Sequence, residues 1–472
     1  MHVLILYFLI IKTFVSWNLR NSITEEKQKN NIIFVLVDDM GWKDLGCYGS
    51  DFYETPAIDA LANKGVRFTQ AYAAHSVCSP TRASILTGCY PARVGVTSFI
   101  PGIVRPYSKL NPPKDWTRFL KMSETTYAEV FRDNGYKTFH AGKWHVGELG
   151  PEYHGFESVV ENDYNTINLE DPKNVFHYTN AAIDFIEKNK ENPFIAVISH
   201  ITVHVPLEAR PEHVSKYLSK NPGASGQNNE IMGGMIEYLD NSIAHLLDRL
   251  ERMGIMDRTY IIFFSDNGGL THADGRTATS NSPLRSGKSQ FYEGGIRVPF
   301  FIAGPGLRGG TVVDTPVISM DIFPTMLELA GLDILPQVHK DGRSLVSLLT
   351  GEKTSLDRKN FFWHYPHYQT MPPHGAVRSG DWKLVENYET GRIELFNLAN
   401  DLAEAHDLSA LYPQVTGEMK DLFNKHLEDI KAPMPTLNYK YNPAKDGRSN
   451  ESYDKRDERE FQQEEYLELK KK

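Results

Sequence analysis

Strongly apolar, β-branched runs recur along this chain, and four of them end in polar or charged residues. The runs are IIFVLVDD (32–39), KTFHAGKWH (137–145), PFIAVISHITVH (193–204), YIIFFSDNGG (260–269) and VPFFIAGPG (298–306). Such runs are typical of strands buried on both faces of a parallel sheet. Helical patterns lie between them, at 232–250 and at 123–135, where we expect Ser123 to cap the helix and Gly135 to stop it. The sequence therefore predicts an α/β fold with a large, mostly parallel sheet sandwiched by helices.

The pattern changes near residue 360, where short strand-like pieces replace the long runs. FFWH, GAVRSG, WKLVEN and IELFNL are followed by a helical pattern near 412–430. We expect a smaller antiparallel sheet with one helix there. The predicted organisation is an α/β domain at 25–359, a C-terminal α+β subdomain at 360–442 and a charged tail at 443–472, either disordered or a frayed helix.

The first 24 residues carry an apolar run too short to span a bilayer, which predicts a secretory signal peptide and a secreted, periplasmic or extracellular protein. A buried first strand is the alternative interpretation. No later segment resembles a membrane span. The net charge of −9, without a long Lys/Arg cluster, argues against nucleic acid as a partner and leaves anions to local basic sites.

The polar residues after the strands predict one shared site, because ligands of open α/β sheets bind beyond the carboxyl ends of the strands. Asp38, Asp39, Asp266 and Asn267 offer only hard oxygen ligands, the set expected for Ca²⁺ or Mg²⁺. Taken singly, an Asp pair at a strand end can also be a helix cap or a solvated loop.

A second group of residues is cationic or can become so. It consists of Arg82, Lys143, His145, His204 and Lys288. A lone His is more often a core residue and a lone Lys a surface residue. Several cations converging with a metal would suit a compact oxyanion such as sulfate or phosphate.

The stretch CSPTRASILTG places Cys78 at the expected start of a helix, where free N–H groups favour an anion such as a thiolate. A small buried hydrophobe is the plain interpretation. A thiolate phosphatase is another, although the spacing from cysteine to arginine does not fit the cysteine phosphatase loop. Cys47, Cys78 and Cys89 are too few for a disulfide framework, and whether Cys47 and Cys89 pair is open.

Together these motifs resemble the type I, formylglycine-dependent sulfatase family, whose fold is alkaline phosphatase-like. The resemblance rests on CSPTR with LTG at 86–88, VDDMGWKDLGCYGS, AGKWHVG, HVPL, SDNGG and GKSQFYEGGIRVP, and it covers residues 30–435. It implies that a maturating enzyme, the formylglycine-generating or sulfatase-maturating enzyme, oxidises Cys78 to formylglycine (3-oxoalanine), the hydrated nucleophile. It also implies a metal site of Asp38, Asp39, Cys78, Asp266 and Asn267 for Ca²⁺, with Mg²⁺ as an alternative.

The remaining roles implied by this resemblance fall on the cationic group. Arg82 would stabilise the formylglycine, and Lys143, His204 and Lys288 would contact the sulfate. His204 would also be the general acid to the leaving oxygen, and His145 the base that starts collapse of the diol.

The substrate is less defined by the sequence. Loop 96–119 carries Arg105 and Trp116, which could contact sugars and further sulfates or belong to a solvated loop; segment 364–380, with His374 and Arg378, could face the pocket or be structural. We expect a carbohydrate sulfatase acting on polysaccharide-derived oligosaccharides. The alternatives are a phosphonate monoester or phosphodiester hydrolase and a noncatalytic sulfated-glycan binder.

Overall fold

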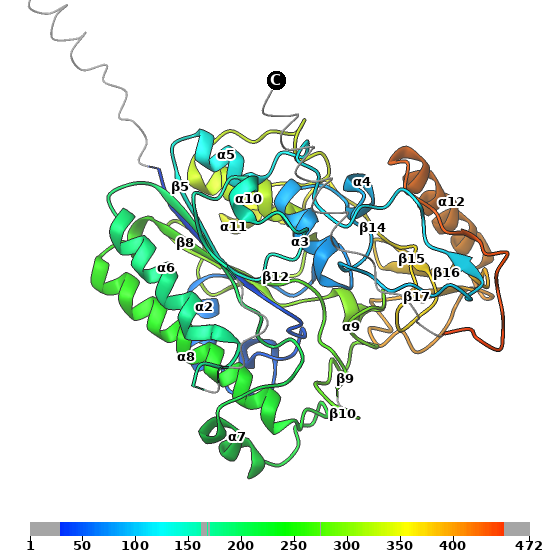
Figure 1. Cartoon of the computed structure of the whole chain (residues 1–472), viewed down its shortest axis with the longest axis horizontal. Helices are drawn as coiled ribbons and strands as arrows, with labels where there is room; N and C mark the ends of the chain where they lie inside the picture. Colours follow the sequence, from blue (N-terminus) through cyan, green and yellow to red (C-terminus); the bar gives the residue numbers. More distant parts are fainter. Residues whose placement is uncertain (1–28, 162–167, 169, 274, 448–472) are drawn as a thin grey trace, which may run out of the picture.

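The computed structural model describes residues 29–161, 168, 170–273 and 275–447, so the predicted signal segment and most of the charged tail lie outside the described residues. Its main body is one eight-stranded sheet between two layers of helices (Figure 1). In spatial order the strands are β12 (Thr311–Val313), β2 (Val66–Phe68), β11 (Phe300–Ala303), β8 (Thr259–Ser265), β1 (Asn31–Val37), β7 (Phe194–Ser199), β5 (Lys137–Gly142) and β6 (Ser158–Val160). The central strands pair in parallel, and β11 runs antiparallel to both of its neighbours. The mostly parallel α/β sheet predicted from the sequence is confirmed.

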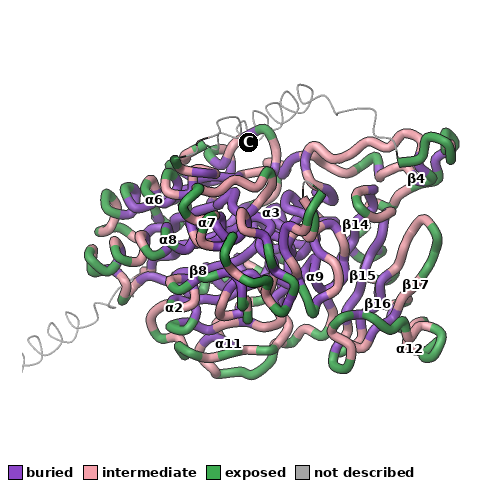
Figure 2. The backbone as a smooth tube through the Cα atoms, turned by 90° about the horizontal axis from the view of Figure 1, so that it is seen from below, coloured by how far each residue is buried: buried purple, intermediate pink, exposed green. Residues whose placement is uncertain are grey.

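The apolar runs are buried on both faces because helices cover both sides of the sheet. On β1, Ile32, Phe34 and Leu36 pack into one core, and Ile33, Val35 and Val37 pack into the other. The first core includes side chains of α3 (Cys78–Thr87), α5 (Tyr127–Asp133), α10 (Ile322–Ala330) and α11 (Val346–Leu349). The second includes side chains of α2 (Pro56–Lys64), α6 (Val175–Asn189), α7 (Pro211–Leu218) and α8 (Glu230–Met253). In Figure 2 the buried segments, drawn in purple, gather in the middle of the molecule, and most exposed segments lie toward its outside.

The smaller sheet lies at one end of the molecule and is antiparallel throughout. Its strands are β14 (Asn360–Tyr365), β15 (His374–Ser379), β16 (Trp382–Asn387) and β17 (Ile393–Asn397), and helix α12 (Pro413–Asp429) covers one face. The other face packs against the main body through Trp363, Tyr365 and Phe396, which share a core with Tyr72 and Val77. The predicted smaller antiparallel sheet with one helix is therefore confirmed.

Short elements complete the chain. They are α4 (Pro91–Val94), α9 (Glu293–Ile296), the pairs β3 (Ala71–Tyr72) with β13 (Val317–Ile318), β4 (Leu110–Asn111) with β18 (Thr436–Leu437) and β9 (His272–Ala273) with β10 (Arg276–Thr277), and the 3₁₀ turns 46–48, 151–154, 172–174, 256–258 and 319–321. Among the described residues, no helix is both long enough and apolar enough to cross a bilayer. All three cysteines are unpaired.

Two predicted boundaries are wrong. Helix α5 begins after Thr126 and not after Ser123, because Thr126 forms a capping box with Glu129: each side chain accepts a hydrogen bond from the other residue's backbone N–H, at 3.2 and 2.8 Å. Strand β7 ends at Ser199, five residues before His204. The residues between form a loop tied to Asp38, whose backbone N–H donates to the Thr202 carbonyl at 3.1 Å and whose carbonyl accepts from Val203 at 2.7 Å.

Candidate active site

The predicted site residues converge beyond the carboxyl ends of the central strands. Asp38 and Asp39 follow β1, and Asp266 and Asn267 follow β8, the strand paired with β1 in parallel. Lys143 and His145 follow β5, His204 lies in the loop after β7, and Cys78 is the first residue of α3. Because β5, β7, β1 and β8 are neighbours in that order, residues more than two hundred positions apart meet at one sheet edge.

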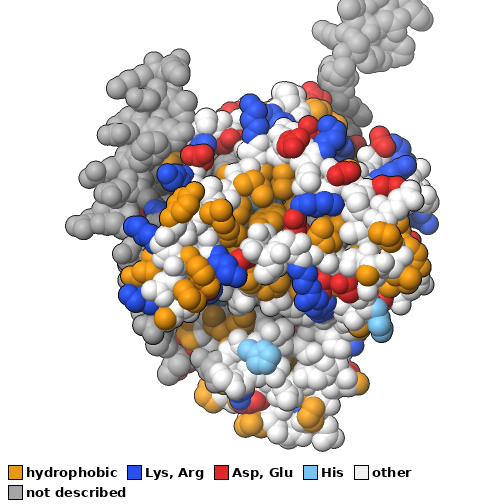
Figure 3. Space-filling model, turned by 90° about the vertical axis from the view of Figure 1, so that its right-hand side faces the viewer, with side chains coloured by type: hydrophobic (Ala, Val, Ile, Leu, Met, Phe, Trp, Pro, Cys, Tyr) orange, Lys and Arg blue, Asp and Glu red, His pale blue; other side chains and the backbone are white. Residues whose placement is uncertain are grey.

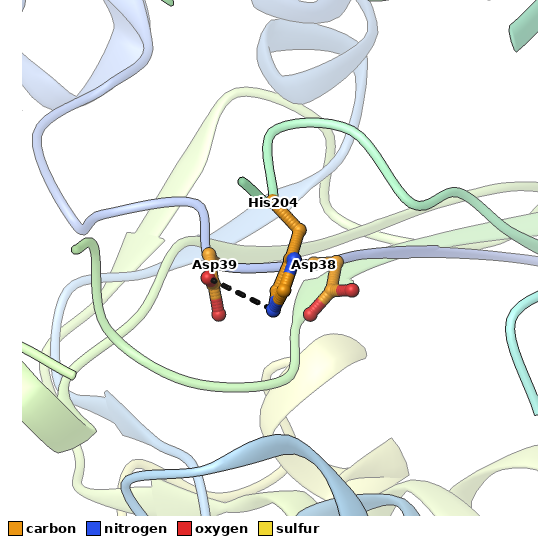
Figure 4. A group of neighbouring side chains, drawn as sticks. All are labelled: Asp38, Asp39 and His204. Carbon is orange, nitrogen blue, oxygen red and sulfur yellow. Dashed lines mark ion pairs between the residues drawn. The ribbon is translucent and has the colours of Figure 1, made fainter. Parts of the chain in front are cut away.

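The acidic residues form the buried floor of the site. Asn267 donates from Nδ2 to Asp39 Oδ1 at 2.8 Å, and the backbone N–H of Asp39 donates to Asp266 Oδ1 at 3.2 Å. Asp39 has a φ of 63°, a left-handed conformation that is uncommon for a residue other than glycine. Figure 4 shows Asp38 and Asp39 side by side with the ring of His204, whose Nε2 lies 3.8 Å from Asp39 Oδ2.

Three cations neutralise this floor. The Nζ of Lys143 pairs with Asp38, and the Nζ of Lys288 lies 2.6 Å from Asp39 Oδ1. The guanidinium of Arg82 lies against Asp266, with its Nη2 2.7 Å from Oδ2. Each carboxylate has a cation of its own, which compensates for the cost of burying the charge.

The surroundings shift the pKa values of the carboxyl groups in opposite directions. Burial alone would raise the pKa of Asp38, but Lys143, His204 and Arg82 hold it well below its usual range. The pKa of Asp39 is likewise lowered, because Lys288 and His204 outweigh burial. Burial and the charge of Asp38 instead raise the pKa of Asp266 well above its ordinary value.

The acidic floor fits a hard cation. Among the described residues, Asp38 Oδ1 and Asn267 Oδ1 are buried without a hydrogen-bond partner. One ligand atom each from Asp38, Cys78 and Asp266 lie within 4.8 Å of one another, and the same holds for Asp38, Asp39 and His204. Oxygen atoms with unused lone pairs, gathered beside carboxylates, are what Ca²⁺ or Mg²⁺ requires.

Cys78 lies beside the acidic floor, with its Sγ within 4.8 Å of carboxylate oxygens of Asp38 and Asp266, and it is 2% exposed. Its helix is held at the start by Ser79 and Thr81: Ser79 Oγ accepts from the Ile100 backbone N–H at 3.1 Å, and Thr81 Oγ1 accepts from the His75 N–H at 3.2 Å. Arg82 lies one turn further along the same helix. The spacing of cysteine and arginine thus places both side chains at the acidic floor.

The two histidines have defined tautomers, because each donates to a backbone carbonyl. His145 Nε2 donates to the Ile100 carbonyl at 2.6 Å, which leaves Nδ1 as an acceptor. His204 Nδ1 donates to the Val205 carbonyl at 2.6 Å, which leaves Nε2 facing Asp39. Burial lowers the pKa of His145 to about 3 and that of His204 to about 4. Both rings are therefore neutral at pH 7.

A cavity of about 590 Å³ adjoins the site on the β5 side. Its lining includes Lys143, His145 and His204, together with Trp144 and Tyr153. A volume of this size is typical of small-molecule pockets. The side chains that would act on a bound ester therefore border a space large enough for its organic part.

The four residues predicted to contact substrate are placed differently. Arg105 donates to the Gln369 carbonyl and lies over the Tyr368 ring, and the Trp116 ring packs edge-on against His367 at 4.7 Å. His374 is 1% exposed, and its Nδ1 donates to the Pro372 carbonyl at 2.9 Å. Arg378 is 4% exposed, and its donors reach Tyr72 and Gly380, between the two sheets. The loop residues Arg105 and Trp116 thus lie against the small domain, and His374 and Arg378 are packed inside.

Sequence reasoning missed Ser199, which orients Arg82. Arg82 Nη1 donates to Ser199 Oγ at 2.6 Å, and Ser199 Oγ donates to the Lys143 carbonyl at 2.7 Å. The available signal was a serine as the last residue of a buried run, immediately before His200.

Comparison with known proteins finds similar sequences over most of the chain. The profile of the family described as Sulfatase matches residues 30–332, and a profile described as N-sulphoglucosamine sulphohydrolase, C-terminal, matches residues 287–432. A sulfatase of Formosa agariphila is 31% identical, with 82% of this chain and 86% of that protein covered. The human N-acetylgalactosamine-6-sulfatase is 28% identical, with 87% and 88% covered.

A solved structure is similar over most of the chain. The crystal structure of Ps i-CgsB in complex with k-i-k-neocarrahexaose superposes with a TM-score of 0.72 and 26% sequence identity, covering 86% of this chain and 94% of that one.

Proposed function

Since this chain belongs to the sulfatase family, and is therefore a sulfuric ester hydrolase, we propose that it removes sulfate from carbohydrates at the site around Cys78. The observation that carries the proposal is the convergence of three cations and an acidic floor on this one cysteine. Such a site stabilises the charge that develops on a transferred oxyanion. The carbohydrate is supported by the related N-acetylgalactosamine-6-sulfatase and by the saccharide in the Ps i-CgsB complex.

In this proposal Asp38, Asp39, Asp266 and Asn267 hold a divalent cation together with the side chain at position 78. The hard oxygen set favours Ca²⁺, with Mg²⁺ as the alternative. The cation would supply positive charge to the sulfate oxygens. Lys143, Lys288 and His204 contact the sulfate, since each already lies against Asp38 or Asp39 at the edge of the acidic floor.

Cys78 is the precursor of the nucleophile. A maturating enzyme converts it to formylglycine, whose hydrated form supplies one hydroxyl to attack sulfur and a second to expel sulfate afterwards. Arg82, fixed by Ser199 and Asp266, keeps a positive charge beside position 78.

The histidines carry the protons. His145 is the base, because its Nδ1 is buried, unprotonated and without a partner among the described residues. His204 is the general acid to the leaving sugar oxygen, through Nε2. Burial lowers the pKa of His204, whereas Asp39 and Asp38 raise it, and a sulfate anion bound beside Nε2 would favour the protonated ring further.

Export is also part of the proposal. It rests on the apolar N-terminal run alone.

Sulfate release tests the proposal directly. Protein whose Cys78 peptide has been checked for conversion by mass spectrometry is incubated with sulfated mono- and oligosaccharides, and free sulfate is measured by ion chromatography. Release from a sugar supports a carbohydrate sulfatase and identifies the ester. An aryl phosphonate monoester and an aryl phosphodiester are tested alongside the sugars. Hydrolysis of either one, without release of sulfate from any sugar, would refute the carbohydrate sulfatase proposal. Cys78→Ala is the matched control and should release nothing.

A further inference from the structure

The segment that follows α12 runs back along the outer edge of the molecule to loop 96–119. We call residues 433–446 the C-terminal strap; it is the orange-red segment at the right edge of Figure 1. Its strand β18 pairs antiparallel with β4 in the loop, Thr436 opposite Asn111 and Leu437 opposite Leu110. Two segments more than three hundred residues apart in the chain therefore form one ribbon.

Asn438 fixes the strap to the loop. Its side-chain amide donates to the carbonyls of Pro106 and Ser108, at 3.0 and 2.7 Å, and its backbone N–H donates to the Lys109 carbonyl at 2.9 Å. Ser108 Oγ in turn donates to Asp446 Oδ1 at 2.6 Å. Asn438 is only 8% exposed, so these hydrogen bonds are shielded from water. The ribbon is thus held in one conformation.

The side chains that flank Asn438 point outward. Leu437 is 69% exposed and Tyr439 is 99% exposed, and Met434 and Tyr441 are exposed as well. Four of the nine large hydrophobic side chains exposed in the described part of the chain lie within residues 434–441 of the strap. Single exposed hydrophobic residues are ordinary, but a cluster on a fixed backbone points to a contact surface.

Cations accompany the aromatic rings on this surface. The Nζ of Lys109 lies 5.9 Å from the centre of the Tyr441 ring, and that of Lys445 lies 4.9 Å from the centre of the Tyr107 ring. Lys440, between the two exposed tyrosines, is itself exposed. Figure 3, which looks at this end of the molecule, shows hydrophobic and Lys or Arg side chains interspersed on the surface. Tyrosine faces suit sugar rings, and ammonium groups suit sulfates.

The same loop continues into the active site. Ile100 accepts from His145 Nε2 through its carbonyl and donates to Ser79 Oγ through its N–H. Ser108, which contacts the strap, is eight positions after Ile100, so the Cα atoms of these two residues are at most about 29 Å apart. A bound chain of several sugars would extend further from the site toward the strap than a monosaccharide would.

We propose that the C-terminal strap is an outer binding surface for a sulfated polysaccharide chain, in which Tyr439 and Tyr441 stack on sugar rings and Lys440 and Lys445 pair with sulfates other than the one hydrolysed. This inference rests on the proposed function for its choice of ligand. Because the strap is already fixed by Asn438, binding orders few protein groups, which favours affinity.

Affinity electrophoresis tests the surface without turnover. Full-length Cys78→Ala protein is run in native gels that contain carrageenan, chondroitin sulfate or dextran sulfate. We expect retardation in at least one gel, and we expect Tyr439→Ala with Tyr441→Ala to weaken the apparent Kd about tenfold. Tyr412→Ala removes an exposed tyrosine at the start of α12 and is the matched control, with no expected effect. Equal retardation of all three proteins, or retardation of none in any gel, would overturn the proposal.

Turnover separates the two proposals. In this experiment Cys78 is kept and converted to formylglycine. Compared with the protein that carries both tyrosines, the double tyrosine variant should keep kcat/KM for 4-nitrophenyl sulfate and show a raised KM only for long sulfated oligosaccharides. Loss of turnover on the aryl ester would mean that the strap acts on the active site itself, and would refute an outer surface. If the unsubstituted protein releases no sulfate from any ester yet is retarded through the strap, the proposed function fails and the binding surface stands.

Discussion

Replacing Lys383 by methionine should strongly destabilise the fold, because this lysine is the positive centre of a buried charge cluster between the two sheets. Its Nζ lies 2.8 Å from Glu293 Oε1 and 2.9 Å from Glu404 Oε1, and all three side chains are fully buried. Tyr72 donates to Glu293 Oε2 at 2.7 Å, and Arg297 Nη1 lies 3.4 Å from the same oxygen. The cluster joins β16 of the small sheet to α9 of the main body.

The size of the loss in the free energy of unfolding depends on the groups that Lys383→Met leaves without a partner. Methionine fills the volume of the lysine but leaves two buried carboxyl groups without their shared cation. Breaking a buried pair by removing one partner costs about 3–5 kcal/mol, so we expect that loss in the free energy of unfolding. Lys420→Met removes the partner of Glu386 at a partly exposed position and should cost less than about 1 kcal/mol.

A second variant identifies which carboxyl group carries the charge. Burial raises the pKa of Glu404 to about 7, whereas Lys383 and Arg297 hold that of Glu293 at about 2 against the effect of burial. The stabilising contribution of a protonated Glu404 is complete below about pH 4.5, the ordinary pKa of the group, and is lost as pH rises through about 7. Glu404→Gln has no such proton to lose, so its stability relative to the unsubstituted protein should rise between pH 5 and pH 8.

The assay is equilibrium unfolding in urea, followed by tryptophan fluorescence at pH 5 and pH 8. The reasoning is refuted if Lys383→Met costs no more than Lys420→Met. It is also refuted if the stability of Glu404→Gln relative to the unsubstituted protein does not rise from pH 5 to pH 8, since Glu404 would then lose no proton in this range.

Three further predictions concern the helix boundary, the metal and the general acid. Thr126→Ala should cost about 1 kcal/mol in urea unfolding by removing the capping box, and Ser123→Ala should cost nearly nothing; the reverse order would place the cap at Ser123. Dialysis against EDTA should lower the melting temperature, Ca²⁺ should restore it, and Asp39→Asn should abolish the response; an unchanged melting temperature in EDTA would argue against a metal at the acidic floor. His204→Gln should lower kcat on a sugar sulfate about 10²- to 10⁴-fold but much less on 4-nitrophenyl sulfate, whose leaving group needs no proton, and equal losses would exclude a general acid role.

The sequence alone determined the class of fold and most of the site. Long β-branched runs such as 32–37 and 260–265 can only be satisfied by burial on both faces, so the sandwiched parallel sheet follows from them. The carboxyl ends of parallel strands meet at the same edge of a sheet, which is why the sequence alone predicts that Asp38 and Asp266 lie together. The sequence also predicts the start of α3 at Cys78, because an apolar helical pattern directly follows an irregular segment.

Tertiary structure decided what depends on contacts between distant segments. A serine at the end of a buried run does not by itself show that Ser199 orients Arg82, and no local signal shows that the loop at 200–204 is tied to Asp38 or that Arg378 is enclosed between the sheets. The same holds for the strap, whose pairing with loop 96–119 depends on where α12 ends in space. Secondary-structure propensity and the spacing of apolar residues act over a few residues, and they determine the helices and strands. The contacts named above depend on packing between segments hundreds of residues apart, which no local pattern encodes.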